Sequence, residues 1–573
     1  MEFHMSKAFT LTDYLLERLR ELGADRVFGV PGDFTLSMLD HIGRDGRLQW
    51  VGCANELGAG YAADGYARVR GIGVLCTTFG VGELSAINAI AGSFAEYVPV
   101  VHVVGAPSRA VQAARNCTHH SLGTGDFGVF ERMAHEVVCA HATLDEHDAC
   151  AEIDRVLRTV MSQRRPGYIV MPSDLADLPV RAPEAPLART SDTTDPDALR
   201  QFSRDARALL QHASSVSLLA DILVQRMGAE PSLHSLIDAG DIPHATLLSG
   251  RRVVNEEHPA YLGTYNGAAS EPAVRAAIEE AEVLIKAGVR FTDLTSGFFS
   301  QHLAIDRLID IGPHASSVAG RQYGPIELAD ALDALHAIFV DRAPLPRTER
   351  HRVAGHRHDE AYASAALSQS TLWQTVSEAL HPGDLLIAEQ GTSFYGLGAH
   401  RLPDDVLFIG QPLWASIGYT LPALLGASLA APRRRPVLLI GDGSAQLTIA
   451  ELGTMIRQHV NAIIVVVNND GYTVERAIHG ADAAYNDIAR WDWTALPAAL
   501  GKGRTSFSAR ASTPAELREA LACARTSGDR LSLIEAVVPG MDVPPLLREL
   551  GKAAGAVNEG PAGHTPSEAE AAG

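Results

Sequence analysis

The residues with the clearest chemical potential follow two predicted strands in the last third of the chain. Asp442 stands between two glycines directly after the apolar strand predicted over residues 436–440, and Asn469 follows the β-branched strand predicted over 462–467. If these strands are adjacent and parallel, both side chains lie at the same carboxyl edge of a sheet, where doubly wound folds bind ligands. Together they would offer a carboxylate and an amide oxygen, and a nearby backbone carbonyl could add a third ligand. Mg²⁺ prefers hard oxygen ligands of these kinds.

The same turn is suited to a phosphate. Gly443 permits close approach of the backbone to a ligand, and the helix start around Ser444 offers free N–H groups. The alternative is two Asx-rich turns that only cap helices, which is the more common situation for either turn alone. The pair, separated by a helix and a strand, favours a site for Mg²⁺ and a phosphorylated ligand.

The first third of the chain has acids and histidines at comparable positions. Glu56 opens a predicted helix directly after a predicted strand, Asp33 lies in a turn after another strand, and His119 and His120 lie in a loop. Taken alone, Glu56 fits a carboxylate that stabilises a helix N-terminus, and paired histidines are usually structural or solvated. Asp33 and the histidines lie at loop positions that could converge on one cleft, which is the functional alternative.

Helix and strand signals alternate in both outer thirds. Strands are predicted over residues 26–30, 48–53, 73–78, 99–104, 385–388, 436–440 and 462–467, and helices over 56–69, 83–97 and 446–460. Nearly continuous apolar strands are typical of a parallel sheet covered on both faces. The middle third restarts with weaker signals and strands over 216–220, 246–248 and 283–285. This pattern predicts an α/β protein with doubly wound parallel sheets.

Two composition breaks divide the chain. Residues 183–196 are rich in Pro, Thr, Asp and Ala, and residues 343–358 are rich in Arg, Pro and His. The breaks predict three domains, over 6–182, 197–342 and 359–552. The Ala, Gly, Glu and Pro-rich residues 553–573 predict a disordered tail.

Composition excludes several classes of protein. Of 573 residues, 46% are hydrophobic and 20% are charged, which is typical of a globular protein. The formal net charge of -20 disfavours general nucleic-acid binding, because such a surface repels phosphate backbones. The six cysteines form no CxxC pair, which argues against a disulfide scaffold and a structural zinc site.

The sequence also argues against a membrane protein. The uncharged stretch between Asp405 and Arg433 contains several Gly and Pro residues, so it fits a buried helix and its entry loop better than a membrane span. The N-terminus lacks the pattern of a signal peptide. We therefore expect a soluble, cytoplasmic protein that binds neither a membrane nor nucleic acid.

Specific segments resemble a known family. The Gly-Asp-Gly motif at Asp442, followed by a helix–strand unit and Asn-Asn at Asn469, resembles the thiamine diphosphate signature. Residues 469–480 (NDGYTVERAIHG) and 411–419 (QPLWASIGY) are similar to the 2-keto acid decarboxylases. Within them they are nearest the indolepyruvate and branched-chain or phenylpyruvate group, with pyruvate decarboxylase a close relative.

The resemblance spans roughly residues 10–550 and implies a fold and a reaction. It implies a thiamine diphosphate-binding fold in both outer domains and a Rossmann-like middle domain. The implied reaction is non-oxidative decarboxylation of a 2-keto acid to an aldehyde and CO2 through a thiamine diphosphate ylide and an enamine. Thiamine diphosphate and Mg²⁺ are the implied cofactors.

The resemblance assigns the cofactor site residue by residue. The metal ligands correspond to Asp442, Asn469 and the carbonyl of Gly471. The cofactor-binding residues correspond to Thr392, Ala415, Ile417, Gly443, Ser444, Asn469, Gly471 and Tyr472. Ile417 matches the bulky apolar residue that holds the cofactor in a bent shape. Many pyruvate decarboxylases have glycine where Ala415 stands, and a carbonyl contact with the aminopyrimidine survives this change if φ is negative.

The implied catalytic residues are Glu56, Asp33, His119, His120 and Glu475. In the family, the acid matched by Glu56 shares a proton with the pyrimidine ring and so promotes the tautomer that activates the cofactor. The other four correspond to a proton relay that protonates the carbon from which CO2 leaves and assists product release. The paired histidines favour a simple decarboxylase over a benzoylformate-type or acetolactate-type relative.

The resemblance also implies a substrate pocket and an assembly. Gln390, Phe394 and Val474 match positions that face the keto-acid side chain, and Val543, Leu546 and Leu547 match a C-terminal helix that closes over it. Phe394 fills volume where some indolepyruvate enzymes have a smaller residue, which favours aliphatic or phenyl side chains over indole. The N- and C-terminal domains of two chains jointly build each site in the family. We therefore expect a homodimer or homotetramer with sites shared between chains.

Three other functions compete with this interpretation. A thiamine diphosphate-dependent carboligase, of acyloin or acetolactate type, shares the enamine and is the main alternative. An NAD oxidoreductase is disfavoured because Ser85 stands where the third glycine of a dinucleotide motif is expected after Gly80 and Gly82. A non-catalytic paralogue is disfavoured because the acids and histidines named above are all present.

Overall fold

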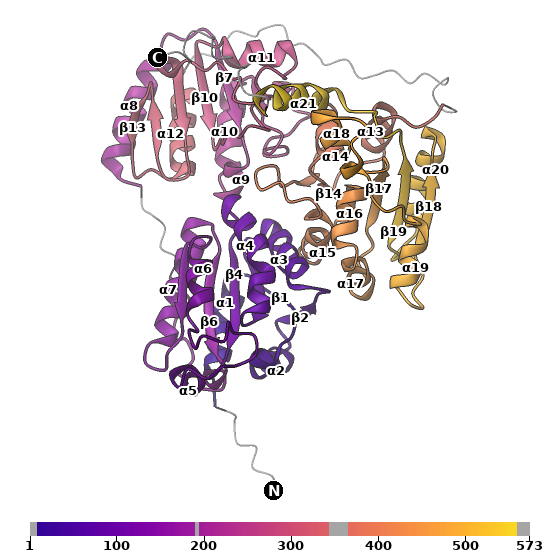
Figure 1. Cartoon of the computed structure of the whole chain (residues 1–573). Coiled ribbons are helices and arrows are strands. Elements are labelled where there is room, and N and C mark those ends of the chain that lie inside the picture. Colours follow the sequence, from indigo (N-terminus) through magenta and orange to yellow (C-terminus); the bar gives the residue numbers. More distant parts are fainter. Residues whose placement is uncertain (1–7, 189–193, 343–364, 559–573) are drawn as a thin grey trace, which may run out of the picture.

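The computed structural model describes residues 8–188, 194–342 and 365–558. The chain forms three α/β domains around three separate sheets (Figure 1). In Figure 1 the N-terminal domain lies at the bottom, the middle domain at the upper left and the C-terminal domain at the right. Apart from one edge of the middle sheet, every strand pair in the described residues is parallel, which confirms the predicted α/β class with doubly wound parallel sheets.

The N-terminal sheet has the order β2-β1-β3-β4-β6-β5. Its strands are β1 (Arg26–Gly29), β2 (Gln49–Gly52), β3 (Gly73–Thr78), β4 (Val100–Ala106), β5 (Ala140–Thr143) and β6 (Gly167–Pro172). Its helices are α1 (Leu11–Glu21), α2 (Leu36–Asp45), α3 (Glu56–Arg70), α4 (Val81–Ala95), α5 (Arg109–Ala113), α6 (Val129–His135) and α7 (Ala149–Gln163). Every residue of β3, β4 and β6 is buried, because helices cover both faces of the sheet.

The middle sheet has the order β13-β12-β11-β10-β7-β8-β9. Its strands are β7 (Val216–Ala220), β8 (His244–Thr246), β9 (Tyr261–Thr264), β10 (Val283–Ala287), β11 (Leu308–Ile311), β12 (Ser316–Val318) and β13 (Arg321–Tyr323). Its helices are α8 (Pro196–Leu210), α9 (Leu223–Arg226), α10 (Glu230–Gly240), α11 (Pro272–Glu279) and α12 (Leu328–Val340). We expected a wholly parallel sheet, and this expectation is wrong at one edge. There β12 runs antiparallel to both β11 and β13, and short turns join these strands.

The C-terminal sheet has the order β15-β14-β16-β17-β19-β18, which is the N-terminal order with each strand replaced by its counterpart. Its strands are β14 (Asp384–Ala388), β15 (Leu407–Ile409), β16 (Arg435–Gly441), β17 (Ile463–Asn468), β18 (Phe507–Ala511) and β19 (Ser532–Val537). Its helices are α13 (Gln369–Glu378), α14 (Thr392–Leu397), α15 (Thr420–Ala430), α16 (Asp442–Thr448), α17 (Glu451–Arg457), α18 (Thr473–His479), α19 (Leu496–Leu500), α20 (Pro514–Thr526) and α21 (Pro545–Asn558).

Two segments of the C-terminal domain differ from the prediction. The single helix predicted over 446–460 is two helices, since α16 begins already at Asp442 and the chain turns at residues 449–450. That turn aims Glu451 at the N-terminal domain, where its Oε1 accepts the N–H of Ala54 at 2.7 Å. Helix α21 runs on to Asn558, because its alanines favour helix. Residues 553–558 of the predicted tail are thus helical, and 559–573 lie outside the described residues.

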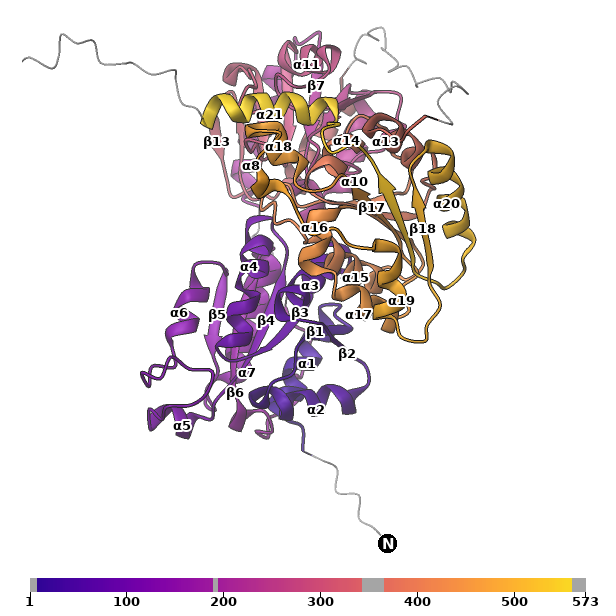
Figure 2. The same ribbon diagram turned by 45° about the vertical axis from the view of Figure 1, so that its right-hand side comes forward.

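The two outer domains pack directly on each other through α3 and α15. A Cβ on Gly65 would overlap the carbonyl of Ala423, and a Cβ on Gly426 would overlap the carbonyl of Ala62, so only glycine fits at these two positions. One hydrophobic core runs through both domains. Helix α21 lies across α14 and α18 at the far side of the C-terminal domain (Figure 2).

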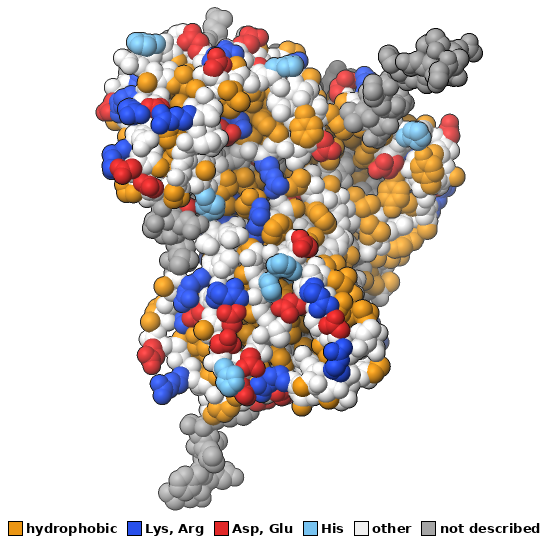
Figure 3. Space-filling model, turned by 60° about the vertical axis from the view of Figure 1, so that its left-hand side comes forward, with side chains coloured by type: hydrophobic (Ala, Val, Ile, Leu, Met, Phe, Trp, Pro, Cys, Tyr) orange, Lys and Arg blue, Asp and Glu red, His pale blue; other side chains and the backbone are white. Residues whose placement is uncertain are grey.

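The surface carries charged side chains among hydrophobic and uncharged ones. Acidic and basic side chains are interspersed on the face that Figure 3 shows. Among the described residues no helix combines the length and the apolar character that crossing a membrane requires.

Candidate active site

The predicted metal-binding residues meet at the carboxyl edge of the C-terminal sheet. Strands β16 and β17 are adjacent and parallel, so Asp442 and Asn469 leave the same edge. Asp442 Oδ1 accepts the N–H of Gly443 at 2.8 Å, and its Oδ2 accepts the N–H of Gly471 at 3.2 Å. Burial raises the pKa of Asp442 to about 6, so a cation beside it would stabilise the ionised carboxylate.

The amide of Asn469 lies close to two other oxygen atoms. With its nitrogen turned toward them it donates to both, and its oxygen accepts the hydroxyl of Thr473 at 2.9 Å; with its oxygen turned toward them, the three oxygens have the spacing of cation ligands. The side-chain oxygen of Asn469 faces two other acceptors, with Gly471 O and Asp442 Oδ1 each 3.0 Å away. Three oxygens this close without a proton between them repel one another. An octahedral Mg²⁺ with bonds of about 2.1 Å holds neighbouring ligands about 3 Å apart. The spacing therefore fits a bound Mg²⁺, whereas an empty site would favour the flipped amide.

A cavity of about 270 Å³ opens beside this edge. The predicted residues that line it are Gln390, Thr392, Ala415, Ile417, Asp442, Gly443, Ser444, Asn469, Gly471, Tyr472, Val474, Glu475 and Leu547. They come from the ends of β14, β16 and β17, the loop after β15, and helices α18 and α21. The cavity has the position that ligands take in doubly wound folds.

Three predicted pocket residues lie elsewhere. Phe394 is buried on the side of α14 that faces the core, where its ring stacks on Phe408 with a centroid distance of 6.0 Å. Its neighbours Ser393 and Tyr395 line the cavity instead. Val543 and Leu546 also pack into the hydrophobic core rather than along the cavity. The expectation that Phe394 limits the substrate pocket is therefore not met by the structure.

Several lining residues escaped the sequence interpretation. Leu294 and Phe298 come from the middle domain, and Ile478, Leu550 and Ala554 come from α18 and α21. They give the cavity an apolar wall. The helical spacing of Leu547, Leu550 and Ala554 on α21 is a signal that could have identified that part of the wall. Leu294 and Phe298 lie in an irregular segment without such a pattern.

A buried acid and two unpartnered polar atoms lie at the inner wall of the cavity. Burial raises the pKa of Glu389 to about 7, and the hydroxyl of Thr420 donates to its Oε2 at 2.5 Å. Gln390 donates from its amide to the hydroxyl of Tyr395 at 2.8 Å, whereas its Oε1 and the hydroxyl of Ser393 are buried without a partner. Unsatisfied buried groups at a cavity wall are suited to contact with a ligand.

The backbone at Ala415 is left-handed, with φ of 52°. The condition of a negative φ, on which the carbonyl contact with the aminopyrimidine was made to depend, is not met. An L-residue in this conformation costs about 1–2 kcal/mol relative to glycine. This cost explains why glycine suits the position, and alanine tolerates it because its side chain is small. Ile417, which follows, is 37% exposed at the cavity.

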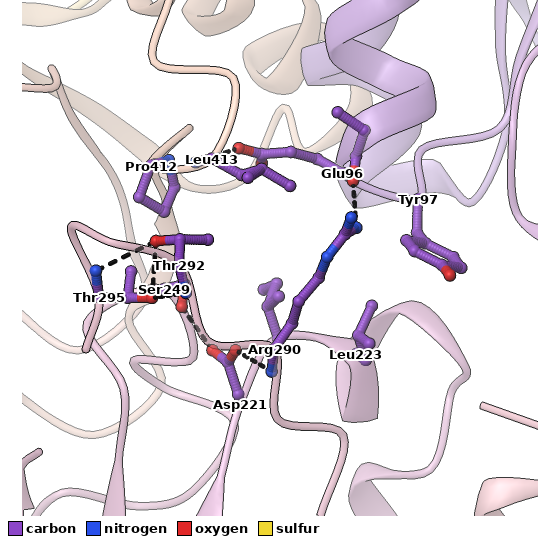
Figure 4. A pocket seen from close by; sticks show the side chains of 13 residues that line it. Glu96, Tyr97, Asp221, Leu223, Ser249, Arg290, Thr292, Thr295, Pro412 and Leu413 are labelled. Carbon is purple, nitrogen blue, oxygen red and sulfur yellow. Dashed lines mark hydrogen bonds between the residues drawn. The ribbon is translucent and has the colours of Figure 1, made fainter. Parts of the chain in front are cut away.

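The loop that carries Ala415 is held by a carboxylate of the N-terminal domain. Glu96, at the end of α4, accepts the N–H of Leu413 at 3.0 Å and that of Trp414 at 3.4 Å. The same carboxylate accepts a hydrogen bond from Arg68 at 2.9 Å. Figure 4 shows this place, where Glu96, Leu413 and Arg290 of the middle domain surround one pocket. The N-terminal domain therefore holds this loop, and the middle domain reaches the same place through Arg290, which donates to the carbonyl of Ala95 at 2.8 Å.

The predicted acids and histidines of the first third gather at the carboxyl edge of the N-terminal sheet. Asp33 begins a short 3-10 helix after β1, and its Oδ2 lies 2.8 Å from Nε2 of His119. The rings of His119 and His120 are 4.6 Å apart. Glu56 begins α3 after β2, and a Cβ on Gly82 would lie 3.4 Å from its Oε1.

The two groups of predicted residues do not meet within one chain. Among the described residues, every one that lines the cavity belongs to the middle or the C-terminal domain. Glu56, Asp33, His119 and His120 are absent from this lining. A single chain thus presents an acid–base edge and a separate ligand cavity.

Comparison with known proteins identifies the family. Models of the thiamine pyrophosphate enzymes match three segments: the N-terminal TPP binding domain over residues 9–127, the central domain over 203–338 and the C-terminal TPP binding domain over 395–536. The chain belongs to the thiamine pyrophosphate enzymes.

Its relatives within that family have a narrower description. The chain is 53% identical to an alpha-keto-acid decarboxylase of Mycobacterium avium over 544 residues, which cover 95% of this chain and 96% of the relative. It is 52% identical to an alpha-keto-acid decarboxylase of Mycobacterium leprae over 546 residues, with 95% and 96% covered. The family resemblance predicted from the sequence is confirmed.

Proposed function

We propose that this protein decarboxylates a 2-keto acid to an aldehyde and CO2, with thiamine diphosphate and Mg²⁺ as cofactors. The observation that carries the proposal is the close oxygen triad of Asp442, Asn469 and Gly471 at the edge of a cavity, in a chain that belongs to the thiamine pyrophosphate enzymes. The relatives named alpha-keto-acid decarboxylase support the same reaction class.

The residues at the cavity fit the diphosphate end of the cofactor. Asp442, Asn469 and the carbonyl of Gly471 would hold Mg²⁺, and Ser444 would hold a phosphate oxygen. A Cβ on Gly443 would lie 2.6 Å from the ring of Tyr472, so a larger residue would clash there. Glycine avoids this clash and leaves the backbone accessible to a ligand. Thr392, the backbone at Ala415 and the side chain of Ile417 would position the ring end.

The chain contributes orientation and proton transfer. When bound, thiamine diphosphate supplies a nucleophilic carbon that takes up the electron pair released with CO2. Glu56 holds a proton at the pyrimidine ring. The Asp33–His119 pair and His120 move protons at the reacting carbon, and Glu475 is the exposed acid of the cavity lining. The apolar wall of Phe298, Ile478 and Leu550 excludes water from the reacting atoms.

We propose that two chains combine to complete each site. The acid–base edge and the cavity are both needed for the reaction, yet they are separate in one chain. Pairing the edge of one chain with the cavity of another accounts for both, and a homodimer or a homotetramer satisfies this requirement. A cytoplasmic location stays a prediction from the sequence.

The cavity wall favours a 2-keto acid with an apolar side chain. Phe394 does not line the cavity, so it gives no reason to exclude an indole side chain. Leu294, Phe298, Val474 and Leu547 form an apolar wall that suits aliphatic and aromatic side chains alike.

The reaction is tested with a panel of 2-keto acids that carry aliphatic, phenyl and indolyl side chains. Each is incubated with the full chain, thiamine diphosphate and Mg²⁺, and the free aldehyde and CO2 are measured. We expect both products in equal amounts. A second series contains an acceptor aldehyde, and an excess of hydroxyketone over free aldehyde would instead identify a carboligase. A chain that binds no thiamine diphosphate in the presence of Mg²⁺ would contradict the proposal altogether.

A further inference from the structure

The cluster of Asp33, His119 and His120 has the composition and spacing of a metal site. Among the described residues this is the one group of three His, Cys, Asp or Glu side chains whose ligand atoms all lie within 4.8 Å of one another. The cluster does not suit a hard cation such as Mg²⁺, because two of its three groups are imidazoles. It is also separate from the oxygen triad at Asp442, which lies in another domain.

The backbone and the packing bring the three side chains together. Asp33 follows β1, and the two histidines lie in the loop between α5 and α6, after β4. The ring of Phe34 stacks on His119 with a centroid distance of 5.0 Å and meets His120 edge-on at 6.1 Å. Nδ1 of His120 is buried without a hydrogen-bond partner. The imidazoles are therefore partly preorganised by an aromatic neighbour.

The side chains can close around an ion by small movements. Zinc bonds of about 2.0–2.2 Å in a tetrahedral site place ligand atoms about 3.3–3.5 Å apart. Oδ2 of Asp33 and Nε2 of His119 are 2.8 Å apart and must separate slightly, whereas ligand atoms up to 4.8 Å apart must approach. The side chains of Asp33 and His119 are about half exposed, at 48% and 59%. Exposed side chains of this kind can reorient at little cost, so the ligand atoms can adjust from their present spacing to that of a tetrahedral site.

The donor set selects the type of metal. Imidazole suits Zn²⁺, Cu²⁺ and Ni²⁺, whereas Mg²⁺ prefers oxygen ligands. Three protein ligands leave the fourth tetrahedral position for water or for a substrate group. The expected occupant is therefore a borderline transition-metal dication rather than the Mg²⁺ of the cofactor.

We propose that Asp33, His119 and His120 form a binding site for Zn²⁺ and similar dications, distinct from the Mg²⁺ site at Asp442. An ion there occupies the lone pairs that proton transfer needs, so it blocks the relay and inhibits decarboxylation. The binding site itself stands on geometry alone, whereas the inhibition rests on the proposed function.

Direct metal binding tests the site. The full chain is loaded with thiamine diphosphate and excess Mg²⁺, and Zn²⁺ affinity is measured by competition with a chromophoric chelator. Co²⁺ in place of Zn²⁺ gives an absorption spectrum that reports imidazole ligands and low coordination number. We expect one ion per chain. His119→Asn and His120→Asn are each expected to lower the affinity at least about tenfold, which corresponds to about 1.4 kcal/mol.

Two control variants separate this site from its surroundings. Cys117→Ser removes a free, exposed thiol on the same loop, and His212→Asn removes an exposed histidine of the middle domain. Both are expected to bind Zn²⁺ as the unmodified chain does. Circular dichroism and melting temperature establish that all variants fold.

The outcomes are distinct. Unchanged Zn²⁺ affinity in both His119→Asn and His120→Asn would overturn the site, as would loss of binding in Cys117→Ser or displacement of Zn²⁺ by Mg²⁺. Binding that depends on the histidines without inhibition of decarboxylation would leave the site standing and refute the block of the relay. Absence of decarboxylation under all conditions would instead count against the proposed function, because the chelator competition needs no activity.

Discussion

The N-terminal and C-terminal sheets of this protein share one strand order but present different chemistry at equivalent edges. In both sheets, the first strand of the domain has the second strand on one side, and the third, fourth, sixth and fifth strands follow in that order on its other side. The N-terminal edge carries groups that exchange protons, namely Glu56, Asp33 and the histidines, and they are exposed or half-buried. The C-terminal edge carries buried oxygen ligands beside a largely apolar cavity.

The difference shows how one scaffold is divided between two tasks. Proton transfer needs groups that reach a ligand and stay hydrated enough to ionise, whereas holding a charged cofactor needs buried ligands with fixed spacing. The strand order fixes where the loops emerge, and the loop residues alone decide which task an edge performs. Mutations at the two edges are therefore expected to fail in different ways.

The largest effect is expected at the oxygen triad. Asp442→Ala removes the one carboxylate ligand of the proposed Mg²⁺ site, and we expect metal affinity to fall by more than the about 10–100-fold that loss of an outer-shell partner costs. Thiamine diphosphate binding should fail at Mg²⁺ concentrations that saturate the unmodified chain. Calorimetric titration of the cofactor with Mg²⁺ measures this. Asp470→Asn, next to the site but paired with Arg490, is the matched control. Normal cofactor binding by Asp442→Ala would refute the division of tasks.

The acid–base edge is expected to fail without loss of binding. Glu56→Gln should lower turnover by about 10²–10⁴-fold, because the amide cannot hold the catalytic proton, while cofactor affinity stays within a few-fold. A mixture of Glu56→Gln and Asp442→Ala chains sharpens the comparison. If sites are shared between chains, half of the random dimers contain one intact site, so about a quarter of full activity returns. No recovery in isolated mixed dimers would place both halves of a site in one chain.

The contact that joins the two outer domains is expected to tolerate no side chain. Gly426→Ala places a methyl group against the carbonyl of Ala62, so the free energy of unfolding should fall by about 1–3 kcal/mol or more through forced separation of α3 and α15. Thermal melting of the full chain measures the loss. Gly43→Ala is the control, because a Cβ there meets nothing within 4 Å and lies inside helix α2. Equal melting temperatures for the two variants would argue against a tight crossing.

The smallest effect is expected at His41, a histidine of α2 that belongs to neither edge. Burial would lower the pKa of His41, but hydrogen bonds to Asp177 at 2.9 Å and Asp13 at 2.8 Å outweigh it and raise the pKa above 6.5. Because the folded value is the higher one, the stabilisation is complete below pH 6.5 and is lost as the pH rises through the folded pKa. His41→Asn removes this contribution. The difference in melting temperature between a mildly acidic and an alkaline buffer should therefore be smaller for the variant than for the unmodified chain. An unchanged gap would refute the linkage.

Sequence patterns predicted the parts of the fold that depend on burial and periodicity. Strands such as β3 and β17 are mostly apolar and almost entirely buried, as a covered parallel strand requires, and polar residues follow them at the sheet edges as expected. The position of Asp442 beside Asn469 needed only that β16 and β17 be neighbours. The family resemblance supplied the chemical roles, which composition and spacing alone left open.

Features that depend on the exact path of the backbone were not predictable in this way. Phe394 and Tyr395 are adjacent aromatic residues on one short helix, and which of them faces the cavity depends on where α14 starts. The left-handed conformation of Ala415 could not be predicted, because alanine is not a residue type typical of that conformation. Phe298 reaches the cavity from another domain, so its role depends on how the domains pack.

The hold of Glu96 on residues 413–414 has a consequence for engineering. The end of α4 and the loop after β15 are joined by backbone hydrogen bonds that one carboxylate accepts, although they are far apart in the sequence. A chimera that exchanges the first domain with that of a homologue would change one half of this connection and keep the other. Such chimeras should keep the shape of the coenzyme pocket only when the end of α4 and the loop after β15 come from the same parent protein.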